Sequence, residues 1–407
     1  MHSSFRSSSL VVMVLLASCS SKETTIDTGG TSGTPATPAG PACTTDTECA
    51  SATATPLCET QTKVCVALPP GHEVGYRDGA ATSVTLKEIY AGAKAAKFTD
   101  LAFNPENPAE AWIIGYGDNA LYRGAGLDGE APTFKKILDP AAGHFMLKPP
   151  AIAFGAPGLF GTCGDNLNER GGGDGSAMYF MGPALFDIDP AIIGVRTSGG
   201  LGSHVDMLHN TPLCRGIAHE KANVYWVFNG LDRSLDKYNF NKPHEPGGDD
   251  HSDGEIYRYA MGKVKGVEDG TPSHVFFDST DNFLYVADTG NARIVRLDTT
   301  KGTKGDGLER RNEILEEEAV MGGTTVEELV APGTLSKPSG LEVKGNLIYV
   351  TDTATSTFHV FDKTGLEVRK LKTDLPAGSL SGMAFGPGGK LFFADKVASK
   401  VYRIDPL

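Results

Sequence analysis

The chain has 407 residues, 21% charged and 40% hydrophobic, so it is long enough for one large or two ordinary domains with buried cores. Its formal net charge of -13 argues against nucleic acid or an anionic membrane surface as a partner. Its 50 glycines are typical of a chain built from short strands and turns.

The first 18 residues are expected to form a signal peptide. Residues 10–17 (LVVMVLLA) are an apolar run too short to span a bilayer and of the right length for the core of such a peptide. The run ends in LASC, which resembles the lipobox of bacterial lipoproteins, where the cysteine becomes the lipidated first residue. This resemblance implies a membrane anchor at Cys19 and, because residue 20 is Ser and not Asp, the outer membrane of a Gram-negative bacterium. An ordinary signal peptide with an incidental cysteine is the alternative.

Residues 19–42 are rich in Ser, Thr, Gly and Pro and are expected to form a flexible tether. Residues 43–68 carry four cysteines, Cys43, Cys49, Cys58 and Cys65. In an exported chain these predict two disulfides with three possible pairings, and the spacing lacks the close pairs of a metal site. The segment resembles the short Cys-rich segments of bacterial surface lipoproteins.

One sequence pattern recurs through the rest of the chain. Residues 272–298 (PSHVFFDSTDNFLYVADTGNARIVRLD) contain three short strands separated by turns, and residues 338–362 and 380–405 repeat this pattern. Weaker copies occupy residues 98–122, 149–189 and 214–240. Six copies of one unit predict an all-β, six-bladed β-propeller over residues 84–407.

A fourth, outer strand is expected for each blade. Candidates lie at residues 134–138, 193–197, 255–260, 312–317 and 367–372, and residues 83–90 are expected to supply the missing outer strand of the last blade. This last pairing would close the ring and remove an exposed sheet edge. Residues 310–319, in a charged insertion, are predicted to be helical.

The blade that contains DTGN resembles an NHL-type repeat. This resemblance implies a scaffold shared by ligand-binding propellers and by metal-dependent lyases and hydrolases. The lyases carry metal-binding histidines just before the inner strands, at positions where this chain has Thr99, Pro150, Arg215, Ser273, Ser339 and Ser381. The zinc pattern of the lyases is therefore absent, and the candidates for catalysis at the channel mouth are Asp100, Arg215 and His274.

Cys163 and Cys214 are expected at the same face of neighbouring blades. In an oxidising compartment they predict a disulfide that staples two long insertions. Metal binding or a redox role is the alternative.

Five of the ten histidines lie between residues 204 and 251. His204, Asp206 and His209 are expected in an insertion on the top face of the propeller. The opposite face is expected to carry His219, His244, Asp249, Asp250, His251 and Asp253. Mixed nitrogen and oxygen ligands suit Zn, Cu or Mn, and the Asp-rich part alone suits Ca. The alternative is a solvated acidic turn in which the histidines cap backbone groups.

These observations favour a cell-envelope surface lipoprotein whose propeller binds a ligand or an envelope protein, with a metal site in blade three and no nucleic acid partner. The alternative is a metal-dependent hydrolase or lyase acting at the channel mouth. A third possibility, electron transfer or copper handling, depends only on the His and Cys residues of blade three.

Overall fold

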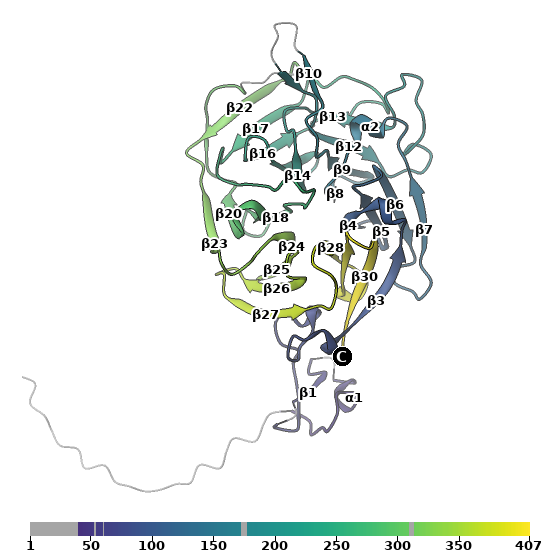
Figure 1. Cartoon of the computed structure of the whole chain (residues 1–407), viewed down its shortest axis with the longest axis vertical. Helices are drawn as coiled ribbons and strands as arrows, with labels where there is room; N and C mark the ends of the chain where they lie inside the picture. Colours follow the sequence, from purple (N-terminus) through teal and green to yellow (C-terminus); the bar gives the residue numbers. More distant parts are fainter. Residues whose placement is uncertain (1–39, 53, 60, 172–176, 309–312) are drawn as a thin grey trace, which may run out of the picture. The chain divides into compact units, whose positions relative to one another are not determined.

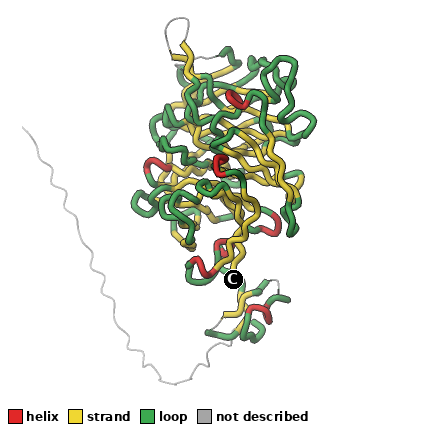
Figure 2. The backbone as a smooth tube through the Cα atoms, turned by 45° about the vertical axis from the view of Figure 1, so that its right-hand side comes forward, coloured by secondary structure: helices red, strands yellow, loops and turns green. Residues whose placement is uncertain are grey.

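The computed structural model describes residues 40–52, 54–59, 61–171, 177–308 and 313–407. The chain divides between Ala67 and Leu68 into two compact units. Strands and loops make up nearly all of both, as Figure 2 shows. Among the described residues, no helix combines the length and the apolar character needed to cross a membrane. The expected anchor, Cys19, lies outside the described residues.

The first unit is held together by two disulfides. It contains α1 (Asp46–Cys49), β1 (Leu57–Glu59) and β2 (Val64–Val66), and the two strands pair in antiparallel fashion. Of the three pairings that the sequence left open, the structure has Cys43–Cys58 and Cys49–Cys65, with Cα atoms 5.8 and 5.5 Å apart. These four buried cysteines form the core cluster of the unit, which is how a segment too short for an apolar core is stabilised.

The second unit is a six-bladed β-propeller, as predicted. Figure 1 shows its six sheets around a common centre, and the innermost strands contact one another in a ring. From the centre outward, blade one contains β4 (Phe98–Asn104), β5 (Asn107–Gly115), β6 (Ala120–Ala125) and β7 (Thr133–Ile137). Blade two contains β8 (Ile152–Phe154), β9 (Leu159–Cys163), β12 (Pro183–Asp187) and β13 (His204–Met207). Blade three contains β14 (Cys214–Lys221), β15 (Val224–Asn229), β16 (Ser234–Asn239) and β17 (Glu255–Tyr259).

The remaining blades follow the same order. Blade four contains β18 (Val275–Asp278), β19 (Phe283–Asp288), β20 (Arg293–Asp298) and β23 (Val326–Val330). Blade five contains β24 (Pro338–Lys344), β25 (Leu347–Asp352), β26 (Thr357–Asp362) and β27 (Glu367–Lys372). Blade six contains β28 (Leu380–Phe385), β29 (Leu391–Asp395), β30 (Lys400–Pro406) and β3 (Val84–Ala91). Short connecting elements are η1 (His72–Val74), η2 (Ala81–Ser83), η3 (Lys94–Ala96), α2 (Ala142–Phe145), η4 (Thr289–Asn291), η5 (Pro387–Gly389) and the hairpin β10 (Glu169–Gly171) with β11 (Ala177–Tyr179).

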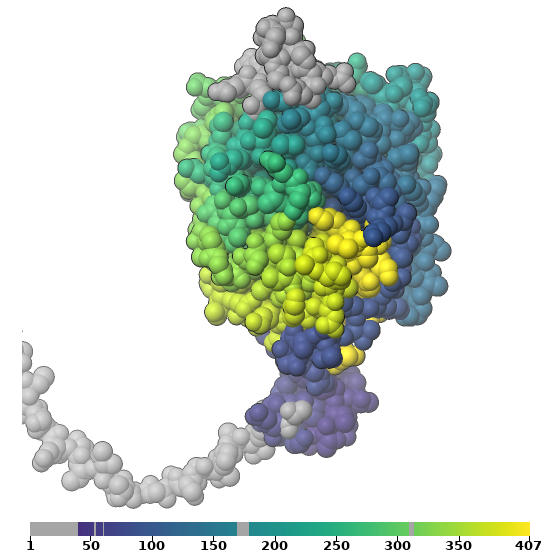
Figure 3. Space-filling view, in the orientation of Figure 1, coloured from purple at the N-terminus to yellow at the C-terminus, as the bar shows by residue number. Residues whose placement is uncertain are grey.

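The ring closes where the sequence predicted. The strand β3, from the start of the unit, pairs along β30, from its end, in the register Val84↔Pro406 to Ala91↔Lys400. Figure 3 shows the yellow C-terminal residues beside the blue residues of the early blades. This pairing leaves the last blade with a full set of four strands.

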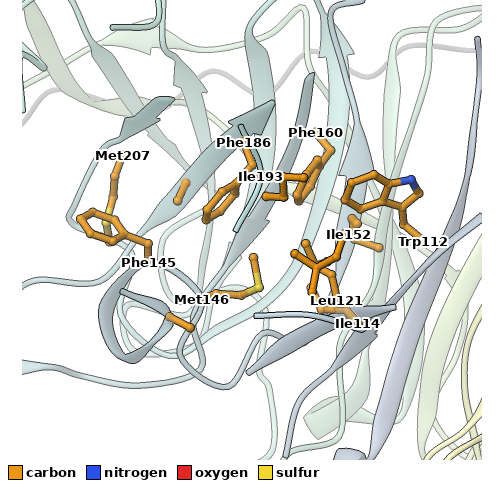
Figure 4. Close-up of a cluster of buried hydrophobic side chains, with 13 residues drawn as sticks. Trp112, Ile114, Leu121, Phe145, Met146, Ile152, Phe160, Phe186, Ile193 and Met207 are labelled. Carbon is orange, nitrogen blue, oxygen red and sulfur yellow. The ribbon is translucent and has the colours of Figure 1, made fainter. Parts of the chain in front are cut away.

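The core lies between neighbouring blades. The middle strands are covered on both faces, so they are continuous apolar runs and not alternating ones; all six residues of β15 are buried. One cluster joins the first two blades, and Figure 4 shows Trp112 and Leu121 of blade one facing Phe160 and Phe186 of blade two.

Two predicted outer strands and a predicted helix are wrong. The outer strand of blade two is β13 and not residues 193–197; that of blade four is β23 and not residues 312–317. The described part of the predicted helix, residues 313–319, contains no helix. Instead β22 (Glu317–Gly322) pairs in parallel with β17 and, with β21 (Thr303–Lys304), extends blade three to six strands. Pairing with β17 overrides the helix propensity of the glutamates.

Residues 68–83 form a strap on blades five and six. Glu73 is buried and accepts hydrogen bonds from Lys344 Nζ and from the Tyr349 hydroxyl, both at 2.6 Å. Arg369 Nε donates to the Pro70 carbonyl at 3.0 Å. The compact unit therefore begins before the first strand of the propeller.

Candidate functional site

A cluster of histidines forms where blades two and three meet. His204 begins β13, the outer strand of blade two, whereas His244 and His251 lie in the loop between β16 and β17 of blade three. The loop is joined to the edge of β13 by backbone hydrogen bonds from His244 N–H to the Val205 carbonyl (2.9 Å) and from Gly247 N–H to the His204 carbonyl (2.8 Å).

The expectation that these histidines lie on opposite faces of the propeller is therefore wrong. That expectation followed from placing the outer strand of blade two at residues 193–197, which left residues 204–209 in a loop on the top face. Because β13 is the true outer strand, His204 lies at the end of β13 that the blade-three loop covers.

Three imidazoles converge at this junction. His204, His244 and His251 can each offer one ring nitrogen so that the three atoms lie within 4.8 Å of one another. The ring centroids of His204 and His244 are 5.1 Å apart, and those of His244 and His251 are 5.6 Å apart.

The hydrogen bonds of the rings determine which nitrogen is available. Nδ1 of His204 lies 2.8 Å from the Leu201 carbonyl, and Nδ1 of His244 lies 2.7 Å from the Glu245 carbonyl. A carbonyl only accepts, so both Nδ1 atoms carry the proton and the neutral rings keep a lone pair on Nε2. Nε2 of His244 is buried and has no hydrogen-bond partner.

Glu313 accepts hydrogen bonds from the Nδ1 atoms of two neighbouring histidines, His209 and His251. Its Oε2 accepts hydrogen bonds from Nδ1 of His209 (2.8 Å) and Nδ1 of His251 (2.9 Å), and its Oε1 accepts from the His209 backbone N–H (2.7 Å). Nε2 of both histidines is buried without a partner. Although burial opposes it, this set of hydrogen bonds lowers the pKa of Glu313 to about 2. His209, His251 and Glu313 also form a second group whose ligand atoms lie within 4.8 Å.

The electrostatics of the cluster suit a cation. Burial lowers the pKa of His204 to about 3 and also lowers the pKa of His244, so both rings are neutral, the form that ligates metal. Burial of His251 is outweighed by Glu313, which raises its pKa. Both oxygens of Asp206 are buried without a partner, and burial raises its pKa to about 8. A nearby cation would stabilise this carboxylate.

Two other carboxylates of the loop accept hydrogen bonds from groups of the loop itself. Oδ1 of Asp250 accepts from the Ser252 hydroxyl at 2.7 Å, and Oδ2 of Asp253 accepts from the Lys242 N–H at 3.1 Å. Asp249 is exposed. Among the described residues, none of the three belongs to a group placed to hold a metal. Asp250 and Asp253 therefore stabilise the turn. The hydrogen bond from His244 to the Glu245 carbonyl is what the alternative interpretation expected of the histidines in this loop.

His219 lies apart from the cluster. Its ring lines the central channel, and Nε2 lies 2.8 Å from the Ala222 carbonyl. The predicted neighbourhood of His219 and His251 is therefore not formed.

Cys163 and Cys214 form the predicted disulfide, with Cα atoms 5.9 Å apart. It joins β9 to β14, and thus the two blades that carry the histidine cluster.

Two members of the cluster were not found from the sequence. Glu313 belongs to the insertion between β20 and β23, and its reach to blade three depends on the parallel pairing of β22. His144, in α2, stacks 5.8 Å from the His209 ring, and its Nδ1 lies 2.7 Å from Asn168 Nδ2. Neither residue has a spacing to the other histidines that would indicate contact.

The three candidates for catalysis do not share one pocket. Asp100 and His274 both line the channel, with Asp100 Oδ1 3.7 Å from His274 Nδ1. Arg215 instead forms a buried ion pair with Asp165, beside a different pocket. The expected three-residue site at the channel mouth is therefore not formed.

Comparison with known proteins shows the fold alone. No protein-family model and no curated protein matches the sequence. Among solved structures, the chain is similar to an auxiliary nutrient binding protein from Bacteroides ovatus (14% identity, 80% of this chain and 76% of that one, TM-score 0.50). It is also similar to virginiamycin B lyase from Staphylococcus aureus (12% identity, 80% and 100%, TM-score 0.46) and to a nidogen/laminin complex (14% identity, 71% and 84%, TM-score 0.46).

Proposed function

We propose that this chain is a binding protein of the cell envelope that holds a divalent transition metal between its second and third blades. The main support for this proposal is the convergence of His204, His244 and His251. Their Nδ1 atoms donate to carbonyl or carboxylate oxygens, so each Nε2 is left to bind a metal ion. Metal-ligating histidines are ordinarily oriented by such hydrogen bonds.

The donor set favours zinc or copper over calcium. Imidazole nitrogens suit Zn and Cu, whereas Ca takes six to eight oxygen ligands. Two loop carboxylates that would supply oxygens, Asp250 and Asp253, instead accept hydrogen bonds from groups of their own loop. A zinc ion bound by imidazole has Zn–N distances of about 2.0 Å, so the three nitrogens, which lie within 4.8 Å of one another, would close around the ion on binding.

A metal at this position would connect two blades. His204 belongs to β13, and His244 and His251 belong to the loop that covers the edge of β13, so one ion would cross-link them. The position at the outer strands, away from the channel residues, favours binding or stabilisation over catalysis at the channel mouth. In the similar Bacteroides ovatus protein a related scaffold serves nutrient binding.

The test is a titration of EDTA-treated protein with intact disulfides against Zn²⁺ and Cu²⁺. We expect one ion per chain in the wild type and a loss of affinity of more than about 100-fold in His244→Ala and in His251→Ala, because each removes a direct ligand. The matched control is His219→Ala, a histidine of the same blade that lies in the channel. Unchanged affinity in the first two variants, or equal loss in the control, would contradict the proposal.

The envelope location is a separate proposal, which rests on the LASC motif. Metabolic labelling with palmitate is expected to mark the wild-type chain and not Cys19→Ser. Labelling that persists in Cys19→Ser would show that this cysteine is not the anchor, without bearing on the metal site.

A further inference from the structure

A cavity of about 310 Å³ lies on the axis of the propeller, lined by the inner strands of all six blades. Asp100 and His274 lie at one end of this cavity, and Gly382 leaves space beside them. A Cβ atom at residue 382 would lie 2.1 Å from Asp100 Oδ1 and 2.5 Å from His274 Cε1. The cavity shares no histidine with the cluster at the outer strands.

One end of the cavity gathers hydrogen-bond acceptors. Asp100 is 5% exposed and Oδ2 accepts from the Ile152 N–H at 2.9 Å, while Oδ1 faces His274. The His274 ring is hydrogen-bonded to the backbone of Pro150, which offers only a carbonyl. Because Nε2 has no partner, Nδ1 makes that bond, and the lone pair of the buried Nε2 is unused.

Glu342 adds a second carboxyl group to the same wall, on the neighbouring blade five. Neither Lys nor Arg lines the cavity among the described residues. Burial therefore raises the pKa of Asp100 and of Glu342 well above the usual range, and the Asp100 charge adds to the effect on Glu342. His274 and His219, the other titratable groups of the lining, both have a lowered pKa because of burial and supply no countercharge.

The rest of the lining is apolar and aromatic. Phe103, Phe154, Phe277 and Phe385 come from four different blades, lie at or near the ends of their inner strands, and are partly buried. Aromatic faces attract cations as well as apolar groups. The cavity thus has an acidic, acceptor-rich end and an aromatic end.

We propose that this cavity binds an organic ammonium ion, with the charged nitrogen between Asp100, Glu342 and His274 and the hydrocarbon part against the phenylalanines. An ammonium group offers up to three hydrogens, and three acceptor groups line this end. A bare metal ion fits less well: these residues do not form a metal-holding group among the described residues, and the apolar lining lacks the oxygens that calcium requires.

This inference rests on the binding role proposed above and names the chemical class of the ligand. Calorimetric titrations would use n-hexylamine, benzylamine and 1,5-diaminopentane as probes, with 1-hexanol and benzyl alcohol as uncharged controls of matched shape. Ca²⁺ and glucose would test the metal and sugar alternatives.

We expect at least one amine to bind at least about tenfold more tightly than its alcohol, and more tightly at pH 8 than at pH 5, because an alkylamine stays charged while the carboxyl groups ionise. Asp100→Asn and Glu342→Gln should each weaken amine binding by about tenfold or more. His244→Ala should bind amines like the wild type, so a failed metal site and a failed channel site are distinguishable.

Several results would overturn the proposal. They are no binding by any amine, equal binding of amines and alcohols, or tighter binding of Ca²⁺ or glucose. Unchanged affinity in folded Asp100→Asn and Glu342→Gln would overturn it as well, and circular dichroism and urea unfolding would establish that these variants are folded.

Discussion

The histidine cluster and the axial cavity both bury ionisable side chains, but they are assembled differently. Asp100 and Glu342 lie in the inner strands of two blades and His274 directly precedes the inner strand of a third, so the repeat itself brings them together. The histidine cluster combines an outer strand, a long loop and an insertion from the next blade. A site built on repeated positions can be located by counting along the repeat, whereas a site built on insertions depends on how each insertion folds.

The largest expected effect comes from removing the disulfide between the two blades that carry the cluster. Cys163 and Cys214 are 51 residues apart in the sequence, and replacing both by Ser is expected to lower the free energy of unfolding by about 4 kcal/mol, because the unfolded chain gains the freedom of that loop. Urea unfolding measures this change. Metal affinity should fall in this variant, while amine affinity should stay close to that of the wild type. Unchanged metal affinity together with weaker amine binding would contradict the assignment of metal to the histidine cluster and of amines to the axial cavity.

The next effect is confined to the cavity. Gly382→Ala places a methyl group against Asp100 and His274 and is expected to cost about 1–3 kcal/mol of folding free energy through overpacking. Amine binding should be lost in this variant while zinc binds as in the wild type. Gly388→Ala provides a control for the general effect of a glycine replacement, since no atom lies within 4 Å of the added methyl, although its positive φ of 68° adds backbone strain. Retained amine binding in Gly382→Ala would place the ligand elsewhere.

A smaller effect is expected from the carboxylate behind the cluster. Glu313→Gln keeps the size of the side chain and weakens its hold on His209 and His251, so zinc affinity should fall by about 10–100-fold, the range for outer-shell partners. Glu327→Gln, in an exposed pair with Arg296, is the matched control. If both variants bind zinc equally, Glu313 does not orient the ligands.

The last expected effect is a pH dependence of stability. Asp100 has a folded-state pKa above its unfolded value of about 3.9, so the folded chain keeps a proton that the unfolded chain releases, and stability falls as pH rises above about 4. Asp100→Asn lacks this loss, so its stability relative to the wild type should rise with pH, by at most about 1.4 kcal/mol per pH unit. Urea unfolding at pH 4, 5.5 and 7 measures it, and a difference that does not change with pH would show that Asp100 is ionised in the folded chain.

The repeat made the fold predictable from the sequence. Strands such as residues 283–288 are apolar runs bounded by Asp, Gly and Asn turns, and the closing strand was identified because it had no other partner. The outer strand of blade two was missed because β13 is only four residues long and half of it is ionisable. Its strand conformation comes from pairing with β12, which no local pattern reports.

Four histidines of the cluster, His204, His209, His244 and His251, were named from the sequence, but their arrangement and the presence of His144 were not. Misplacing β13 separated His204 from His244 and His251. His219 was grouped with them because it was expected to end an inner strand near the same loop, whereas it lies inside β14 and lines the channel. Glu313 could not be found because its contact with the cluster depends on an insertion that returns to the previous blade. In the cavity, Asp100 and His274 were named correctly as channel-lining residues, and Glu342 was overlooked within an apolar strand.

The most direct test of the proposed metal centre is anomalous X-ray diffraction at the zinc edge from crystals grown with one equivalent of Zn²⁺. We predict an anomalous peak bounded by Nε2 of His204, His244 and His251, together with its absence in crystals of His244→Ala. A peak at the axial cavity, or no peak at the junction of blades two and three, would contradict the account.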